Sequence, residues 1–298
     1  MTLPGAPAGA ARWLGAQRID LEVTGSTNDE AARLARAGAS HGTIVVAERQ
    51  TAGRGREGRA WSSPPGMGLY LSAVLRPPLP LALVPPITLA IGVAVCDAAI
   101  AFGAPATLKW PNDTLVGERK LAGVLVEAQS QGGRLDAVIA GIGVNLAGAV
   151  KRRPPYDDPA VGRSDEPSPD RPRDTSGALP PEVADVALTL EEATGKRMDG
   201  AARERFLATL LGGIERWVDR YIACGLEGIA PAWHERMARG LVARATVDGA
   251  HVVGQLVGLD GDGALLLRDG AGRQHRVRAG DVEVIRPTRR SEPLATTC

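Results

Sequence analysis

The segment from Gly53 to Arg59 holds three glycines and three arginines in seven positions, and it follows a β-rich segment, Thr43 to Ala47. Glycine lets a backbone approach a ligand closely and adopt positive φ. Arginine adds a permanent charge and a planar fork of donors that matches carboxylate and phosphate groups. After Gly58 the chain has no helical period and soon reaches Pro64 and Pro65, which disfavour a helix. The pattern therefore predicts a strand that opens into an anion-binding loop.

The glycine spacing in this loop also fits a dinucleotide-binding fingerprint, because Gly53, Gly55 and Gly58 match G-x-G-x-x-G. That fingerprint requires a helix that begins within the motif and an acidic residue about 20 positions later for the ribose. The sequence meets neither requirement. We therefore set the dinucleotide fold aside, and two interpretations remain: an anion-binding loop and an ordinary surface turn.

The composition of the chain limits the classes of partner. The 298 residues are 44% hydrophobic and 3% aromatic, with a formal net charge of +1. This length is enough for one large domain and one small domain. The near-neutral charge argues against a general binder of polyanions, and the scarcity of aromatic side chains argues against a base-stacking surface.

The cysteines and histidines show no ligand or disulfide pattern. The three cysteines are scattered, odd in number and without C-x-x-C spacing, which is typical of a reducing compartment. The four histidines are isolated from one another, and we interpret them as surface or structural residues rather than metal ligands. We expect a cytoplasmic protein without a protein-held metal site.

The apolar pattern predicts an α+β fold, with a mixed, mainly antiparallel sheet and flanking helices. Strands are expected at residues 19–23, 43–48, 69–75, 115–116, 120–127 and 137–145. A helix is expected to begin near Thr27, which fits a capping box with Glu30, and to end at Gly38. Two helices should follow residue 181, the second with an apolar stripe from Phe206 to Tyr221.

The most apolar stretch of the chain, Leu83 to Ala106, is predicted to be core rather than membrane-spanning. It contains Pro85, Pro86 and Asp97, and much of it is alanine and glycine, whereas a spanning helix needs about 20 strongly apolar residues. We expect a buried helix from Ile87 to Phe102 and no membrane partner.

The order of these patterns predicts two domains. Residues 1–18 form an N-terminal extension without a signal-peptide layout, and residues 19–237 form the main domain. Within it, residues 151–181 are rich in proline and charge, which predicts a flexible insertion. Residues 238–287 hold five short strand patterns separated by Asp-Gly and glycine-rich turns, typical of a small SH3-like barrel. Residues 288–298 form a tail.

Five sequence blocks occur in a characteristic order along the main domain. They are Ser26-Thr27-Asn28, Gln50 to Trp61, Lys109-Trp110-Pro111-Asn112-Asp113, Arg119 to Glu127, and Gly141 to Leu146. Together they resemble the biotin–protein ligases, closely over roughly residues 20–150 and in outline over the remainder. The resemblance implies a ligase catalytic domain followed by the SH3-like domain.

The resemblance also implies a two-step reaction with ATP and biotin as substrates and Mg²⁺ as a cofactor. The biotin carboxylate attacks the α-phosphorus of ATP, and the resulting biotinyl-5′-AMP is transferred to a lysine of a biotin carboxyl carrier domain in an acetyl-CoA or acyl-CoA carboxylase. Because that carboxylate is already ionised, the enzyme must supply positioning and positive charge rather than a nucleophile. The arginine- and lysine-rich blocks suit this demand.

Individual site residues follow from the resemblance by their place in the blocks. The implied catalytic residues are Lys120, Arg56 and Asp113. The implied biotin contacts are Ser26, Thr27, Asn28, Gln50, Gly53, Arg54, Gly55, Arg56, Lys120, Gly123 and Gly141. The implied ATP contacts are Arg56, Arg59, Trp61, Asn112, Lys120 and Asn145.

Several alternatives stay open. Asp113 could orient Lys120, hold Mg²⁺ or belong to a plain Asn-Asp turn, and Ser26 to Asn28 could act as helix-cap residues. A lipoate–protein ligase or a nucleic-acid-binding module would use the same loop differently.

Some biotin ligases begin with a DNA-binding helix-turn-helix domain. Only about 18 residues precede the first predicted strand, so we expect no repressor role and no DNA partner. The protein is expected to be a monomer or a homodimer.

Overall fold

The computed structural model describes residues 13–148, 186–247, 250–278 and 282–284. The chain divides into two compact units, with the boundary between Met237 and Ala238. The predicted flexible insertion at 151–181 and the predicted tail at 288–298 lie outside the described residues, as do the first twelve residues of the predicted N-terminal extension.

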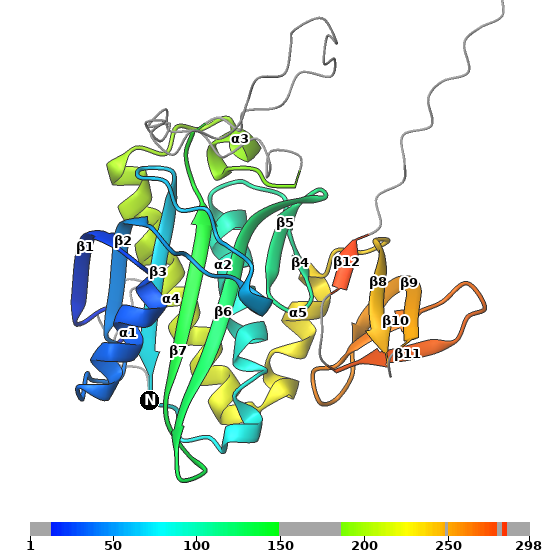
Figure 1. Cartoon of the computed structure of the whole chain (residues 1–298). Coiled ribbons are helices and arrows are strands. Elements are labelled where there is room, and N and C mark those ends of the chain that lie inside the picture. The colour runs from blue at the N-terminus through cyan, green and yellow to red at the C-terminus, as the bar shows by residue number, and fades with distance from the viewer. Residues whose placement is uncertain (1–12, 149–185, 248–249, 279–281, 285–298) are drawn as a thin grey trace, which may run out of the picture. The chain divides into compact units, whose positions relative to one another are not determined.

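The first unit is built on a seven-stranded sheet with the order β1-β2-β3-β7-β6-β5-β4 (Figure 1). The strands are β1 (Arg18–Thr24), β2 (Ile44–Gln50), β3 (Gly68–Leu75), β4 (Ala106–Lys109), β5 (Asp113–Val116), β6 (Arg119–Gln131) and β7 (Arg134–Asn145). β1 pairs with β2 in parallel, and every other pair in this sheet is antiparallel. The predicted mixed, mainly antiparallel sheet is confirmed.

Helices cover both faces of this sheet, with α1 on one face and α2 and α4 on the other (Figure 1). The helices are α1 (Thr27–Arg36), α2 (Ile87–Ala101), α3 (Leu190–Thr194), α4 (Gly200–Cys224) and α5 (Ala230–Arg236). On α1, Ala31 and Ala35 pack against Val45, Val74 and Ile139 of the strands below. This small-residue face brings the start of the helix close to the sheet.

α2 is the helix that the most apolar stretch predicts. The segment Leu81–Ala101 is long and apolar enough to be considered as a membrane span, but 67% of its apolar 18-residue window is buried inside the described fold. α2 contacts β4, β5 and β6 and packs along α4, so it is the central helix of the core. On α4, Phe206, Leu210, Ile214 and Tyr221 of the predicted stripe are buried.

The start of the described chain is tied to the main domain by His41 and a buried carboxylate. Trp13 and Leu14 donate their backbone N–H groups to Glu215, and the Trp13 ring stacks on His41 with 4.2 Å between centroids. His41 Nδ1 also accepts a hydrogen bond from the backbone N–H of Arg76 at 2.9 Å. The tie therefore requires a neutral imidazole.

This tie predicts a modest loss of stability in mild acid. Burial lowers the pKa of His41, against the opposing pull of Asp219 and Glu215. Because the folded pKa lies below the unfolded one of about 6.5, the unfolded chain binds the proton more tightly, and the contribution of His41 is lost as pH falls below that value. Urea unfolding at pH 7.5 and 5 should show a smaller pH effect in His41→Gln than in the unaltered protein. An equal change in the free energy of unfolding between the two pH values in both proteins would contradict this role of His41.

The second unit is a five-stranded antiparallel sheet with the order β11-β10-β9-β8-β12. The strands are β8 (Val242–Val247), β9 (Ala250–Leu259), β10 (Leu265–Arg268), β11 (Gln274–Val277) and β12 (Val282–Val284). They fall on the five strand patterns expected from the sequence. Ala243, Leu265, Leu267 and Val277 are buried between them, as in the predicted small β-domain.

Candidate active site

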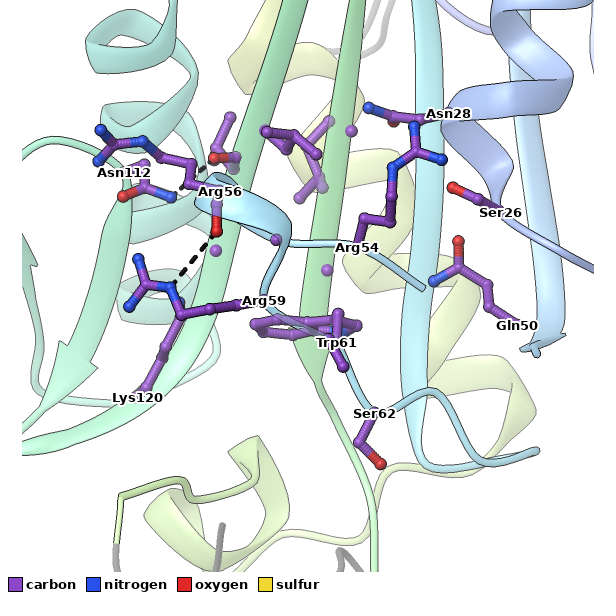
Figure 2. Close-up of a pocket in the computed structure, with 18 of the residues that line it drawn as sticks. Ser26, Asn28, Gln50, Arg54, Arg56, Arg59, Trp61, Ser62, Asn112 and Lys120 are labelled. Carbon is purple, nitrogen blue, oxygen red and sulfur yellow. Dashed lines mark hydrogen bonds between the residues drawn. The ribbon is translucent and has the colours of Figure 1, made fainter. Parts of the chain in front are cut away.

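A cavity of about 200 Å³ opens between the arginine/glycine loop (residues 53–59), the start of α1 and strands β6 and β7 (Figure 2). It brings together most of the residues that the sequence blocks single out. Those residues are Ser26, Thr27, Asn28, Gln50, Arg54, Gly55, Arg56, Arg59, Trp61, Asn112, Lys120, Gly123, Gly141 and Asn145. Gly53 and Asp113 are not among the described residues that line it.

The start of α1 contributes a polar end to the cavity, and the predicted capping box is wrong. Ser26, not Thr27, is the N-cap residue, and in the described structure its side chain makes no capping hydrogen bond. Gln50 instead takes the first N–H group of the helix, because its Oε1 accepts the backbone N–H of Thr27 at 2.8 Å. The buried Ser26 side chain thus lies at a helix N-terminus without accepting a capping hydrogen bond in the described structure.

Asn28 is held on two sides. Its amide nitrogen donates to Glu127 at 2.6 Å, and its amide oxygen accepts from the Ser72 hydroxyl at 2.6 Å. Ser72 and Glu127 were absent from the sequence-based set. The sequence signal for Ser72 was a serine within the apolar strand Gly68–Leu75, and its full burial in the structure requires polar partners.

The arginine/glycine loop folds into a closed turn above the sheet. Gly55 donates its N–H to the carbonyl of Arg59 at 2.7 Å, and Arg59 donates to the carbonyl of Arg56 at 3.2 Å. Glu57 has φ of 57° inside this turn, a conformation unusual for a residue other than glycine. Gly53 has a packing role, because a Cβ there would lie 2.5 Å from the carbonyl oxygen of Trp61.

The loop arginines face different parts of the cavity (Figure 2). Arg54 lies on the side of Ser26 and Asn28, where it pairs with Asp29 at 2.6 Å and approaches Glu127 at 3.5 Å. The hydrogen bond with Asp29 raises the pKa of Arg54. Arg56 and Arg59 lie on the opposite side with Lys120 and Asn112 (Figure 2). The cavity therefore has a hydrogen-bonding end and a cationic end.

Lys120 lies on β6 beside an irregularity in the strand pairing. Leu115 of β5 pairs with Lys120, whereas Thr114 pairs with Ala122, so Leu121 is an additional residue. Such a bulge re-aims neighbouring side chains. Leu121 is fully buried, while Lys120 lines the cavity.

Contacts fix both the backbone and the ammonium group of Lys120. Its backbone N–H donates to Val186 at 2.7 Å, and its carbonyl accepts from Leu188 at 3.1 Å and from the Asn145 side chain at 3.3 Å. Its ammonium group lies 2.6 Å from Asp113 Oδ1 and 5.2 Å from the centroid of the Trp61 ring. Asp113 therefore contacts Lys120, which lines the cavity, although Asp113 does not line the cavity itself.

Three glycines on β6 and β7 make room for the functional side chains. A Cβ at Gly143 would lie 2.5 Å from the Trp61 ring, and one at Gly123 would lie 3.1 Å from Lys120 Nζ. A Cβ at Gly141 would collide with the amide of Asn28. Two of these glycines, Gly123 and Gly141, were singled out from the sequence.

Comparison with known proteins assigns this arrangement to a family. Residues 21–145 match the Biotin/lipoate A/B protein ligase family, and residues 244–284 match the Biotin protein ligase C terminal domain. The Biotin--[acetyl-CoA-carboxylase] ligase of Paracoccus denitrificans is 37% identical over 260 residues, which cover 85% of this chain and 95% of that protein. The chain belongs to the biotin protein ligases.

Two further relatives support this assignment of the ligase. The Bifunctional ligase/repressor BirA of Bacillus subtilis is 32% identical over 273 residues, covering 91% of this chain and 75% of that protein. The structure of the Aquifex aeolicus biotin protein ligase in complex with biotin and ATP is 29% identical, with a TM-score of 0.69, covering 91% and 100% of the two chains. The ligase interpretation thus prevails over the nucleic-acid module, and the second matched domain favours biotin over lipoate.

Proposed function

We propose that this ligase joins biotin to ATP in the cavity and transfers the biotinyl group to a lysine of a biotin carboxyl carrier domain. The observation that carries the proposal is the two-ended cavity, with polar side chains around α1, where Arg54 is paired with Asp29, and a cationic end at Arg56, Arg59 and Lys120. Biotin has a neutral ureido ring and an anionic carboxylate. A molecule of this kind fits with its ring at α1 and its carboxylate toward the phosphates of ATP.

In the first step, a biotin carboxylate oxygen attacks the α-phosphorus of ATP. A P–O bond forms, the bond to the β-phosphate breaks, and pyrophosphate leaves with its electron pair. Lys120 and Arg56 lie where negative charge develops and stabilise it electrostatically. In the second step, the amine of the carrier lysine attacks the acyl carbon, AMP leaves, and the nitrogen loses a proton.

Mg²⁺ is proposed to arrive with ATP as part of the substrate. Among the described residues, no group of three or more His, Cys, Asp or Glu side chains is placed to hold a metal ion. The carboxylate of Asp113 already lies beside Lys120. This contact supports an orienting role for Asp113 on Lys120.

The carrier is proposed to be the biotin carboxyl carrier domain of an acetyl-CoA or acyl-CoA carboxylase in the cytoplasm. The Paracoccus denitrificans relative is a ligase for acetyl-CoA carboxylase, which supports this choice.

Pyrophosphate release tests the first half-reaction without a carrier. The protein should release pyrophosphate from MgATP when biotin is added, and much less when lipoate is added. Release with lipoate alone would transfer the assignment to lipoate ligation, and no release with either compound would contradict adenylate formation. The carrier choice is tested separately by labelling a purified carrier domain and its Lys→Arg variant.

Gly141 tests the placement of the biotin ring. Gly141→Ala should weaken biotin binding by about tenfold or more, because the new methyl group occupies the space of the Asn28 amide and displaces a polar group of the site. ATP binding should change much less. Calorimetric titration with each substrate provides the measurement, and equal losses for both substrates would contradict the proposed placement.

A further inference from the structure

Lys109 lies next to the cavity but has no role in the reaction described so far. It is the last residue of β4 and pairs with Asp113, the first residue of β5. Directly opposed residues in an antiparallel pair place their side chains on one face within contact distance. Lys109 Nζ lies 3.5 Å from Asp113 Oδ2, and the two side chains are only 15% and 14% exposed.

Asp113 therefore lies between two ammonium groups. Its Oδ1 contacts Lys120 at 2.6 Å, and its Oδ2 faces Lys109 at 3.5 Å. The three groups carry two positive charges and one negative charge, which leaves a net charge of +1. Without Lys109, the carboxylate and Lys120 would form a neutral pair.

A neutral pair at this position would serve an anionic substrate poorly. The interaction of a charge with a phosphate oxygen is strong in a partly buried site, and an adjacent carboxylate opposes it. Lys109 is not among the described residues that line the cavity, and its ammonium group contacts Asp113.

We propose that Lys109 is a positioning residue of the ligase, which holds and electrically compensates Asp113 so that Asp113 orients Lys120 without cancelling its charge. The inference rests on the proposed function, in which ATP phosphates lie at Lys120. It separates two roles within one cluster, because orientation of Lys120 depends on Asp113 and net charge depends on Lys109.

A charge-balanced set of variants tests the inference. Lys109→Met removes the charge and keeps the apolar stem, and it should weaken ATP binding by about tenfold in calorimetric titration. Lys109→Arg should bind ATP nearly as well as the unaltered protein. The double variant Lys109→Met with Asp113→Asn has a net charge of +1 again. It should recover most of the ATP affinity, while its rate at saturating substrate stays low because Lys120 is no longer oriented.

Opposite outcomes would overturn the inference. ATP binding by Lys109→Met equal to that of the unaltered protein would remove any role for the charge. A double variant that binds no better than Lys109→Met alone would show that Lys109 supports the strands rather than the charge balance. Thermal unfolding of each variant identifies loss of fold, and exposed Lys196 provides the matched control, since Lys196→Met should leave ATP affinity unchanged.

Pyrophosphate release by the unaltered protein separates the two levels of the proposal. If that protein releases pyrophosphate with biotin but the variants do not follow the charge pattern, the role of Lys109 fails alone. If it binds ATP with the expected pattern but releases no pyrophosphate with biotin, the proposed function fails and the charge role of Lys109 stands. Absence of ATP binding by the unaltered protein would overturn both.

Discussion

Lys120→Ala is expected to lower the rate of biotinyl-adenylate formation by about 10²- to 10³-fold, the usual loss when one donor to a developing oxyanion is removed. The reason is geometric as well as electrostatic. The bulge in β6, the backbone bonds to Val186 and Leu188, and the 2.6 Å contact with Asp113 all fix this one ammonium group at the cationic end of the cavity. Pyrophosphate release with biotin and MgATP measures the loss.

Two controls make the Lys120 prediction specific. Lys120→Ala leaves Asp113 beside Lys109, so the carboxylate keeps an ammonium partner and the melting temperature should change little. Lys196→Ala removes a lysine charge at an exposed position and should leave the rate unchanged. Near-normal turnover by Lys120→Ala would contradict its role in the first step.

The fold could be predicted from sequence where a local pattern dominates. Strands separated by glycine-rich turns were predicted within residues 238–287, and β8 to β12 lie in that range. The buried helix α2 follows from a long apolar stretch that contains a charge and ends at a glycine turn. The third helix after the insertion, α5 (Ala230–Arg236), was missed because seven residues are too short to show a helical period.

Site residues were predictable where glycine and arginine cluster, and not where a polar residue acts through tertiary contact. The cavity gathers the predicted loop and the start of α1, although these residues stand far apart in the sequence from Gly141 and Lys120. Ser72 and Glu127 come from strands whose pairing decides which side chain meets Asn28. No local pattern specifies such a partner, because strand register and helix placement create it.

The same limit explains the wrong capping box. Thr27 and Glu30 have the right spacing, but Gln50 reaches the helix N-terminus from the end of β2 and takes the Thr27 N–H. A long-range hydrogen bond thus replaces a local one, and it leaves Ser26 within the cavity wall. Departure from a local rule at a functional site is the expected pattern when a helix end is reserved for a ligand.

Arg56→Gly is expected to loosen the hold on biotinyl-5′-AMP, so that the activated acyl group escapes and labels lysines on unrelated proteins. In the proposed placement the Arg56 guanidinium lies over the activated phosphate, and its loss removes a charge-assisted contact to that group. Escape of the intermediate should become about tenfold faster or more, mainly through its dissociation rate. Biotin incorporated into added serum albumin, relative to the carrier domain, measures this escape.

The substitution to glycine also changes the backbone, and Arg56→Met separates that effect from the loss of charge. Gly55 and Gly58 flank the position, so a further glycine adds freedom to the turn that closes through the Gly55–Arg59 bond of 2.7 Å. If retention depends on the guanidinium, both variants should label albumin to a similar extent. If it depends on the closed turn, Arg56→Gly should label far more than Arg56→Met. Labelling confined to the carrier in both variants would show that Arg56 does not retain the intermediate, and the charges at Arg59 and Lys120 would then have to account for retention.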